Sequence, residues 1–149
     1  MINNHLIIDA MAMQQVKARY DEAEKNNNTE GMEAARKSYQ ELSQRIENRG
    51  AGYAKVYRLY EEAVERGNEH IDLNEVIWDK DVESLIQLLR ENGVEYFTFS
   101  STWSSAVEIA WLFTQNGCTL EGLVEINSPN TNTFTGEREK AHGYLFAIH

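Results

Sequence analysis

Apolar residues in the first part of the chain recur at alternating steps of three and four positions. In the first stretch these residues are Leu6, Met13, Val16, Tyr20 and Ala23, and in the second they are Met32, Ala35, Tyr39, Leu42 and Ile46. This spacing is typical of helices that pair along a narrow apolar stripe. The polar residues 26–29 separate the two stretches, with Thr29 or Asn28 available as N-cap. We therefore expect an antiparallel helical hairpin over residues 5–49.

A third helix is predicted over residues 53–66. Its apolar face holds Tyr53, Val56, Tyr57, Tyr60 and Val64. A face rich in tyrosine either packs within the chain or serves as a partner surface, and a homodimer is one form of the second alternative. Gly67 and Asn68 end this helix, and the composition changes after them.

The second half of the chain alternates helix and strand patterns. Residues 82–89 and 106–113 have helical periodicity, and Asn-Gly pairs follow both. Residues 94–99, 119–126 and 141–148 are predicted strands, with a loop at 127–138. The order helix–strand–helix–strand–strand predicts a two-layer α/β domain with a mixed sheet. Residues 71–78 are either an extra edge strand or a linker.

The predicted strand at 119–126 has alternating character. Leu120, Gly122, Val124 and Ile126 are expected to point inward, leaving Glu121 and Glu125 on an open face. The chain as a whole is predicted to be α+β, with a helical region at 1–70 and an acidic α/β domain at 71–149. We expect the second region to fold alone, because it contains its own apolar faces.

Charge is distributed unevenly. The net charge is −10, and residues 1–70 hold 10 basic and 12 acidic side chains, whereas residues 71–149 hold 4 and 12. The second region should repel nucleic acid and attract a basic protein surface. No apolar run is long enough for a membrane span, and no basic segment opens a signal peptide. With Cys118 as the single cysteine, these features favour a reduced, cytoplasmic protein without disulfides.

The polar segment at 100–105 is the strongest candidate for chemistry. It connects a predicted strand to a helix start, where backbone N–H groups can hold an anion. The same side chains are ordinary helix caps, and the segment lacks a glycine for close approach to phosphate. A small-ligand or phosphate-binding module, or a hydrolase, remains the alternative function. Its residues would be Ser100, Ser101, Thr102 and Ser104.

No motif predicts a catalytic residue, a metal or a cofactor. No serine has a Gly-x-Ser-x-Gly context, and of the four histidines only His142 is predicted near the serine segment. Asp72, Glu75, Asp79 and Asp81 lack the spacing of a calcium loop. We expect a non-enzymatic protein.

The stretch GVEYFTFSSTWSSAVEIAWLFTQNGCTLEGLVEIN and the ending KAHGYLF resemble a family of small uncharacterised proteins from mobile elements and phages of gut bacteria. The resemblance covers about residues 73–149. It implies a compact α/β domain in a mobile-element setting, where small acidic proteins resemble anti-CRISPR or anti-restriction inhibitors. It implies no functional residues.

The function expected from these observations is inhibition of a nucleic-acid-handling defence protein, such as a CRISPR effector or restriction enzyme, by covering its basic surface. Direct contact with nucleic acid or membrane is not expected. The residues expected to contact the partner are Trp78, Asp79, Asp81, Glu83, Glu95, Trp103, Glu121 and Glu125.

Overall fold

The computed structural model describes residues 4–75 and 77–149, and these form an α+β fold. They divide into two compact units, residues 4–57 and the described residues from 58 to 149. The boundary between the units lies within helix α3 (Ala51–Arg66). The predicted fold class is therefore confirmed, whereas independent folding of residues 71–149 stays a prediction.

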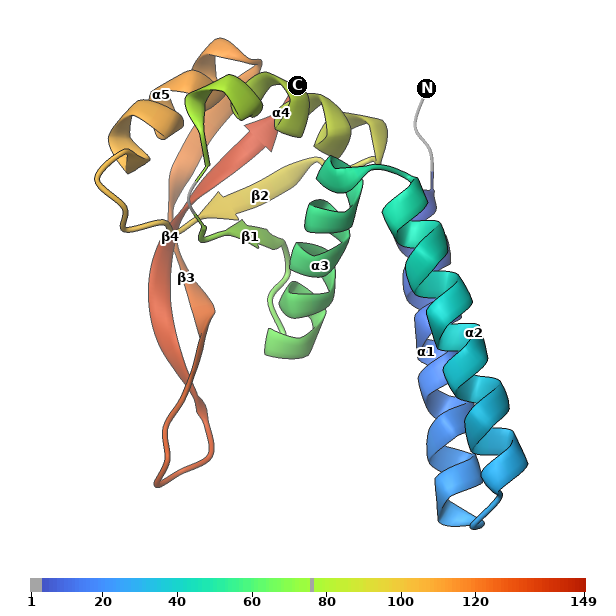
Figure 1. Ribbon diagram of the computed structural model, residues 1–149. Coiled ribbons are helices and arrows are strands. Elements are labelled where there is room, and N and C mark those ends of the chain that lie inside the picture. Colours follow the sequence, from blue (N-terminus) through green and yellow to red (C-terminus); the bar gives the residue numbers. More distant parts are fainter. Residues whose placement is uncertain (1–3, 76) are drawn as a thin grey trace. The chain divides into compact units, whose positions relative to one another are not determined.

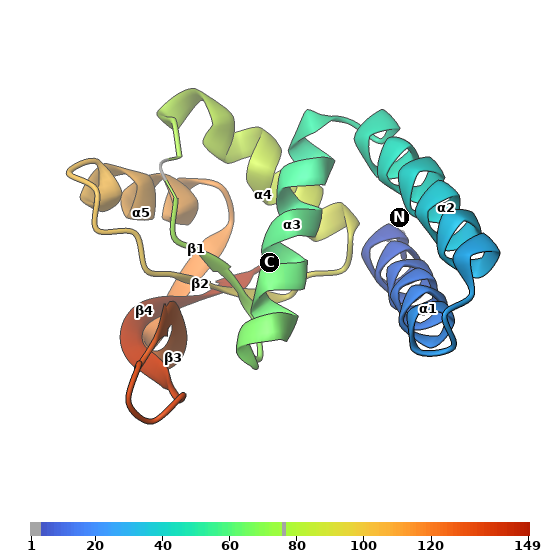
Figure 2. The same cartoon turned by 60° about the horizontal axis from the view of Figure 1, so that its bottom comes forward.

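The first unit is the expected helical hairpin. Helices α1 (His5–Lys25) and α2 (Thr29–Asn48) lie side by side in both views (Figures 1 and 2). Asn28 is the N-cap of α2, and its side chain accepts a hydrogen bond of 3.0 Å from the backbone N–H of Gly31. The predicted stripes form most of the contact, because Leu6, Met13 and Leu42 are buried. Tyr39, however, is 48% exposed.

The start of α3 completes this unit. Tyr53 and Tyr57 are buried and their rings stack, with centroids 6.4 Å apart. Their burial favours the packing interpretation of the tyrosine face. Val64 was predicted on the same face but is 56% exposed, whereas Leu59 is buried.

The second unit contains a four-stranded mixed sheet in the order β1-β2-β4-β3. The strands are β1 (Ile71–Leu73), β2 (Tyr96–Phe99), β3 (Cys118–Thr131) and β4 (Arg138–Ile148). Strand β1 is parallel to β2, and β4 is antiparallel to both β2 and β3. Of the two alternatives for residues 71–78, the edge strand is correct for its first three residues.

Helices α4 (Val82–Glu91) and α5 (Ala106–Gln115) cover one face of this sheet, and a short 3-10 helix, η1 (Asp79–Asp81), precedes α4 (Figures 1 and 2). The core under them is aromatic: the ring of Phe113 on α5 contacts Phe97, Phe99 and Phe146 edge-on, with centroids 5.0 to 5.3 Å apart. Edge-to-face contacts of this kind add to the free energy gained from burial alone.

Strand β3 differs from its prediction in two ways. It extends to Thr131, so that the β3–β4 hairpin projects beyond the rest of the sheet (Figure 1). A bulge at Glu121 shifts the register between Leu120, paired with Phe146, and Gly122, paired with Leu145. Because residues before and after a bulge point to opposite faces, the prediction that Leu120, Gly122, Val124 and Ile126 share one inward face was wrong. Leu120 is 49% exposed.

Candidate functional site

Two exposed tryptophans stand at the carboxyl ends of the parallel strands. Trp78 lies between β1 and η1, and Trp103 lies between β2 and α5. Their exposed fractions are 64% and 59%. The connections that carry them approach one another, because η1 contacts α5. This edge of an α/β sheet is where such domains commonly bind their ligands.

The predicted acidic residues are all exposed, but the structure gathers only some of them. Asp79 and Asp81 form the ends of η1, next to Trp78, and Glu83 lies in the first turn of α4. Glu95 lies at the opposite, amino end of β2, where its carbonyl accepts a hydrogen bond from the N–H of Ile148. The site therefore excludes Glu95.

Glu121 and Glu125 lie on β3, a strand that contacts α5. Within the described residues, no ion pair is formed by these two glutamates or by Asp79, Asp81 and Glu83. An exposed carboxylate without a counter-ion leaves its charge available to a partner.

Helix α5 exposes two residues that sequence reasoning missed. Val107 is 82% exposed and Trp111 is 61% exposed, whereas Ile109 and Phe113 are buried. Val107 and Trp111 have the four-residue spacing that places side chains on one helix face, and Trp103 lies in the connection just before α5. The signal was in the sequence: α5 is apolar on all sides, with Glu108 as its one charged residue. Such a helix is normally buried all round.

Trp103, Val107 and Trp111 are called the α5 stripe below. Exposed apolar surface of this kind, adjacent to polar residues, marks interaction sites in monomeric proteins. Together with Trp78, which precedes η1, and with Asp79 and Asp81 on η1, the stripe forms the candidate interaction surface.

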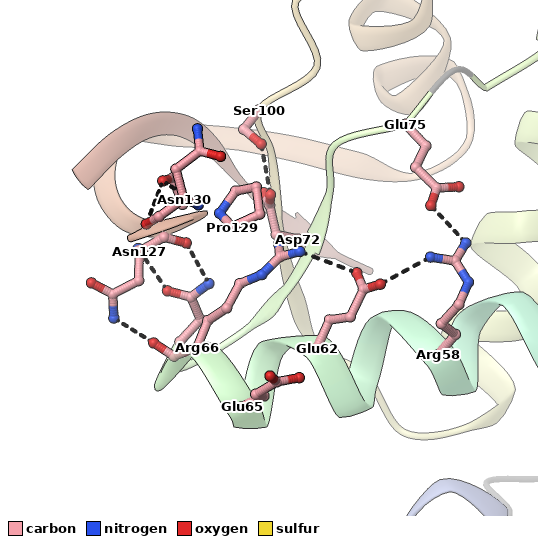
Figure 3. Close-up of polar contacts among 12 residues, drawn as sticks. Arg58, Glu62, Glu65, Arg66, Asp72, Glu75, Ser100, Asn127, Pro129 and Asn130 are labelled. Atoms are coloured by element: carbon pink, nitrogen blue, oxygen red, sulfur yellow. Dashed lines mark hydrogen bonds and ion pairs between the residues drawn. The ribbon is translucent and has the colours of Figure 1, made fainter. Parts of the chain in front are cut away.

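The serine segment is turned toward a buried acid. The hydroxyl of Ser100 donates to one carboxylate oxygen of Asp72 at 2.6 Å (Figure 3). The hydroxyl of Thr98 donates to the other oxygen at 2.7 Å. Asp72 is 5% exposed, and its burial raises the pKa of the carboxyl group, although the hydrogen bonds from Ser100 and Thr98 and the charge of Arg66 oppose this shift. A bound anion near Ser100 would face this carboxylate, so the geometry disfavours an anion site.

The rest of the segment provides little capping. Ser105 occupies the N-cap position of α5, but its side chain makes no capping hydrogen bond. Ser101 accepts a hydrogen bond of 3.4 Å from the N–H of Trp103, and Thr102 and Ser104 are exposed. The expectation that these side chains cap the helix was therefore wrong for Ser105.

The loop after α3 holds the β3–β4 hairpin. The Asn68 side chain accepts from the backbone N–H of Asn127 at 2.8 Å and donates to its carbonyl at 3.1 Å. The Asn127 side chain donates to the carbonyl of Arg66 at 2.7 Å (Figure 3). A hollow of about 310 Å³ lies beside this contact, between residues 67–70 and the sheet. Its lining includes Val124, Leu145 and Thr98.

Ion pairs connect α3 with the segment after β1. Arg58 contacts Glu75 at 2.6 Å and Glu62 at 3.1 Å, and Glu62 also contacts Arg66 at 3.4 Å (Figure 3). These pairs are partly exposed, so each contributes little to stability. Their role is to position the chain that enters and leaves β1.

A buried carboxylate lies in the first unit, away from the candidate surface in sequence. Asp9 on α1 is fully buried and accepts hydrogen bonds from Arg45 at 2.7 Å, Arg49 at 2.9 Å and Tyr53 at 2.7 Å. Burial disfavours the charged form, but the hydrogen bonds from Arg49, Tyr53 and Arg45 outweigh it and lower the pKa of Asp9. Both oxygens of the Asp9 carboxylate accept hydrogen bonds within the unit, which favours a structural role for this cluster.

The described residues form neither a metal site nor a membrane-spanning helix. No group of three or more His, Cys, Asp and Glu side chains could hold a metal ion there. None of the helices in that part of the chain combines the length and apolar character needed to span a membrane.

Comparison with known proteins gave one match. Residues 55–148 match the model of a family described as a domain of unknown function, DUF7698. The match covers most of α3 and all four strands but not the hairpin of α1 and α2. Neither the curated proteins nor the solved structures gave a match.

Proposed function

The chain belongs to the DUF7698 family, and on that premise we propose that it is a non-enzymatic inhibitor that binds a basic surface of another protein. The surface that carries the proposal is the candidate interaction surface on α5 and η1. Its partner is proposed to be a nucleic-acid-handling defence protein.

The exposed α5 stripe is the observation that supports this function best. Trp103, Val107 and Trp111 are each more than half exposed, whereas Phe97 and Phe113 of the same domain are buried. Tryptophan is the residue type most enriched among those that dominate binding energy. An apolar centre with polar residues around it is the usual anatomy of a protein interface.

The charges around the stripe support a basic partner. Asp79 and Asp81 lie on η1, which contacts α5, and Glu108 lies on α5 itself. Glu121 lies on β3, which also contacts α5. Complementary charge of this kind speeds association and selects the partner more than it adds affinity.

A basic protein surface that is accessible to an inhibitor is often one that binds nucleic acid. The acidic charge and the resemblance to mobile-element proteins support a CRISPR effector or a restriction enzyme as the target. The inhibitor would act by occupying the channel that otherwise holds the phosphate backbone.

The alternative, a phosphate-binding module or hydrolase at residues 100–105, has weaker support. Ser100 is engaged by Asp72, and the buried carboxylate would repel an anion. The two functions differ in a simple measurement. A small anion should raise the melting temperature of the protein if it is a phosphate-binding module, but not if it is an inhibitor without an anion site.

The test is inhibition of DNA cleavage by purified CRISPR effectors and restriction enzymes of the host. Wild type should inhibit at least one of them, and Trp103→Ala with Trp111→Ala should weaken the inhibition at least about tenfold, as expected for removal of dominant interface residues. Asp79→Lys with Asp81→Lys should slow association and reduce its salt dependence. Ser100→Ala should leave inhibition unchanged.

A matched control separates this surface from net charge. Glu91→Lys with Glu95→Lys makes the same change in charge at the end of α4 and the amino end of β2. It should leave association nearly unchanged. Equal slowing by both pairs of substitutions, or loss of activity only in the Ser100 variant, would contradict the proposed surface.

A further inference from the structure

Strand β3 is the last strand of the sheet, and one of its edges is open. Among the described residues, its one neighbour in the sheet is β4. The outer N–H and C=O groups of an edge strand are ready to pair with an added strand. Which residues carry those groups follows from the register.

The contact with Asn68 shows the direction in which the backbone N–H and C=O groups of Asn127 point. The side-chain amide of Asn68 bonds to both the N–H and the C=O of Asn127, as the backbone of a neighbouring strand would. These two groups therefore point away from β4. The pairing from Gly122 to Asn127 is regular, and alternate residues of an antiparallel strand point the same way. Leu123 and Glu125 thus also direct their N–H and C=O groups outward.

A second observation on β4 agrees with this assignment. The N–H of Ile148 donates to the carbonyl of Glu95. The backbone N–H and C=O groups of Ile148 therefore point toward β2 rather than β3. By the same alternation, the backbone N–H and C=O groups of Phe146 and Tyr144, two and four positions earlier, also point toward β2. Tyr144 pairs with Leu123, which accordingly receives no ladder hydrogen bond from β4.

The side chains beside the open edge have a definite chemistry. Leu123 is 63% exposed and Leu120 is 49% exposed. Glu121 and Glu125 are exposed and form no ion pair with another described residue. The edge therefore offers backbone hydrogen bonds, apolar contacts and two negative charges within one short stretch.

We propose that the open edge of β3 binds an extended, basic segment of the partner, which adds a strand to the sheet with an apolar residue next to Leu123 and lysine or arginine next to Glu125. This inference rests on the proposed function and specifies how the partner is held. Peptides that add to a sheet edge take affinity from main-chain hydrogen bonds and specificity from alternate side chains.

A second copy of the chain fits this edge less well than a basic segment. In an antiparallel pairing centred on residue 124, the copy's β3 would run along Asn127, where Asn68 already occupies the backbone groups. The two acidic strands would also repel one another. Asn68 limits the open edge to the residues before Asn127, which suits the end of a short peptide segment.

The test uses a short blocked peptide in which a valine and a lysine stand two positions apart among threonines, so that both can lie beside Leu123 and Glu125, with an analogue whose alternate backbone amides are methylated. Methylation removes the N–H donors and keeps the charge. The unmodified peptide should bind at least about tenfold more tightly, the effect of losing two hydrogen bonds of ordinary strength. In hydrogen exchange, the amides of Leu123 and Glu125 should become protected only with the unmodified peptide.

Protein variants complete the test. Leu123→Pro removes one outward N–H of the protein, a position at which proline is tolerated in an edge strand, and should weaken binding of the unmodified peptide. Glu125→Gln keeps the backbone hydrogen-bonding groups intact and should weaken the binding of both peptides. Thermal melting confirms that each variant is folded. Equal binding of the two peptides, no binding of either, or protection produced by self-association without peptide would overturn the proposal.

Failure of the edge proposal can be distinguished from failure of the proposed function. If variants of the α5 stripe lose inhibition of the defence protein while Leu123→Pro retains it, the function stands and the edge proposal fails. If no defence protein is inhibited although the peptide protects Leu123 and Glu125, the edge binds a basic segment and the function assigned to it is wrong.

Discussion

Asp9 provides the sharpest prediction about stability. Its carboxylate is fully buried and receives hydrogen bonds from Arg45, Arg49 and Tyr53, which connect α1, α2 and the start of α3. Asp9→Asn removes the charge but keeps the size. The substitution leaves two guanidinium groups facing a neutral amide, whose own N–H groups are additional donors.

The magnitude follows from the exposure of the partners. Removing one member of a fully buried ion pair costs about 3–5 kcal/mol. The side chain of Arg45 is 48% exposed and that of Arg49 is 23% exposed, so both can recover hydration in the variant. We therefore expect a smaller loss, about 2–3 kcal/mol of unfolding free energy at pH 7.

The loss should depend on pH in a defined direction. The pKa of Asp9 in the folded protein lies below the usual value of 3.8, because the three hydrogen bonds outweigh burial. The stability contributed by its charge is therefore fully present at pH values above the usual pKa. It disappears as the pH falls through the lower pKa of Asp9 in the folded protein. The difference between wild type and variant should be largest near neutral pH and shrink below about pH 4.

Urea unfolding followed by circular dichroism at several pH values measures this difference, and hydrogen exchange of α1 and α2 amides localises it to the hairpin. Asp21→Asn, an exposed change on the same helix, is the control and should cost less than about 0.5 kcal/mol. A loss for Asp9→Asn no larger than the control, or one that stays constant with pH, would refute the reasoning.

The remaining predictions concern the second unit. Burial raises the pKa of Asp72, so its charge destabilises the folded state at pH values above the usual pKa of an aspartate. The Asp72→Asn variant should therefore have a free energy of unfolding at pH 7 no lower than that of wild type. Urea titrations should show that wild type gains stability relative to the variant toward pH 4. Cys118 is buried, which raises the pKa of its thiol, so a colourimetric thiol reagent should modify it far more slowly in the folded protein than in urea. Fragment 55–149 should melt cooperatively and at a higher temperature than fragment 71–149, which lacks the contacts of α3 and Asn68; calorimetry showing equal melting temperatures would contradict this.

The sequence predicted best those elements whose signal is local. The two stripes at steps of three and four predicted α1 and α2, since a helix repeats its face within the span of a few residues. Asn28 and the Asn-Gly pairs marked helix ends through their own backbone and side-chain chemistry, and Gly93 and Gly117 adopt the positive φ values that such ends require.

The sequence predicted poorly those features that depend on a distant partner. The short strand β1 exists because β2 lies beside it, and three residues carry too little periodicity to identify it. Strand β3 extends to Thr131 because β4 and Asn68 pair with it, although residues 127–138 have the polar composition of a loop. The candidate surface was found in part: Trp78, Trp103 and the acids were predicted, whereas Val107 and Trp111 were not among the predicted contact residues.

By itself, then, the sequence determined the class of the chain, its helical hairpin, the sign of its charge and the acidic residues available on its surface. Each of these follows from composition or from periods of a few residues. Only the tertiary structure decided that Asp9 is buried among arginines, that Glu121 breaks the alternation of β3, and that α5 leaves one apolar side uncovered. Burial and register depend on what packs or pairs across long separations in the chain, and a single sequence carries no local record of those contacts.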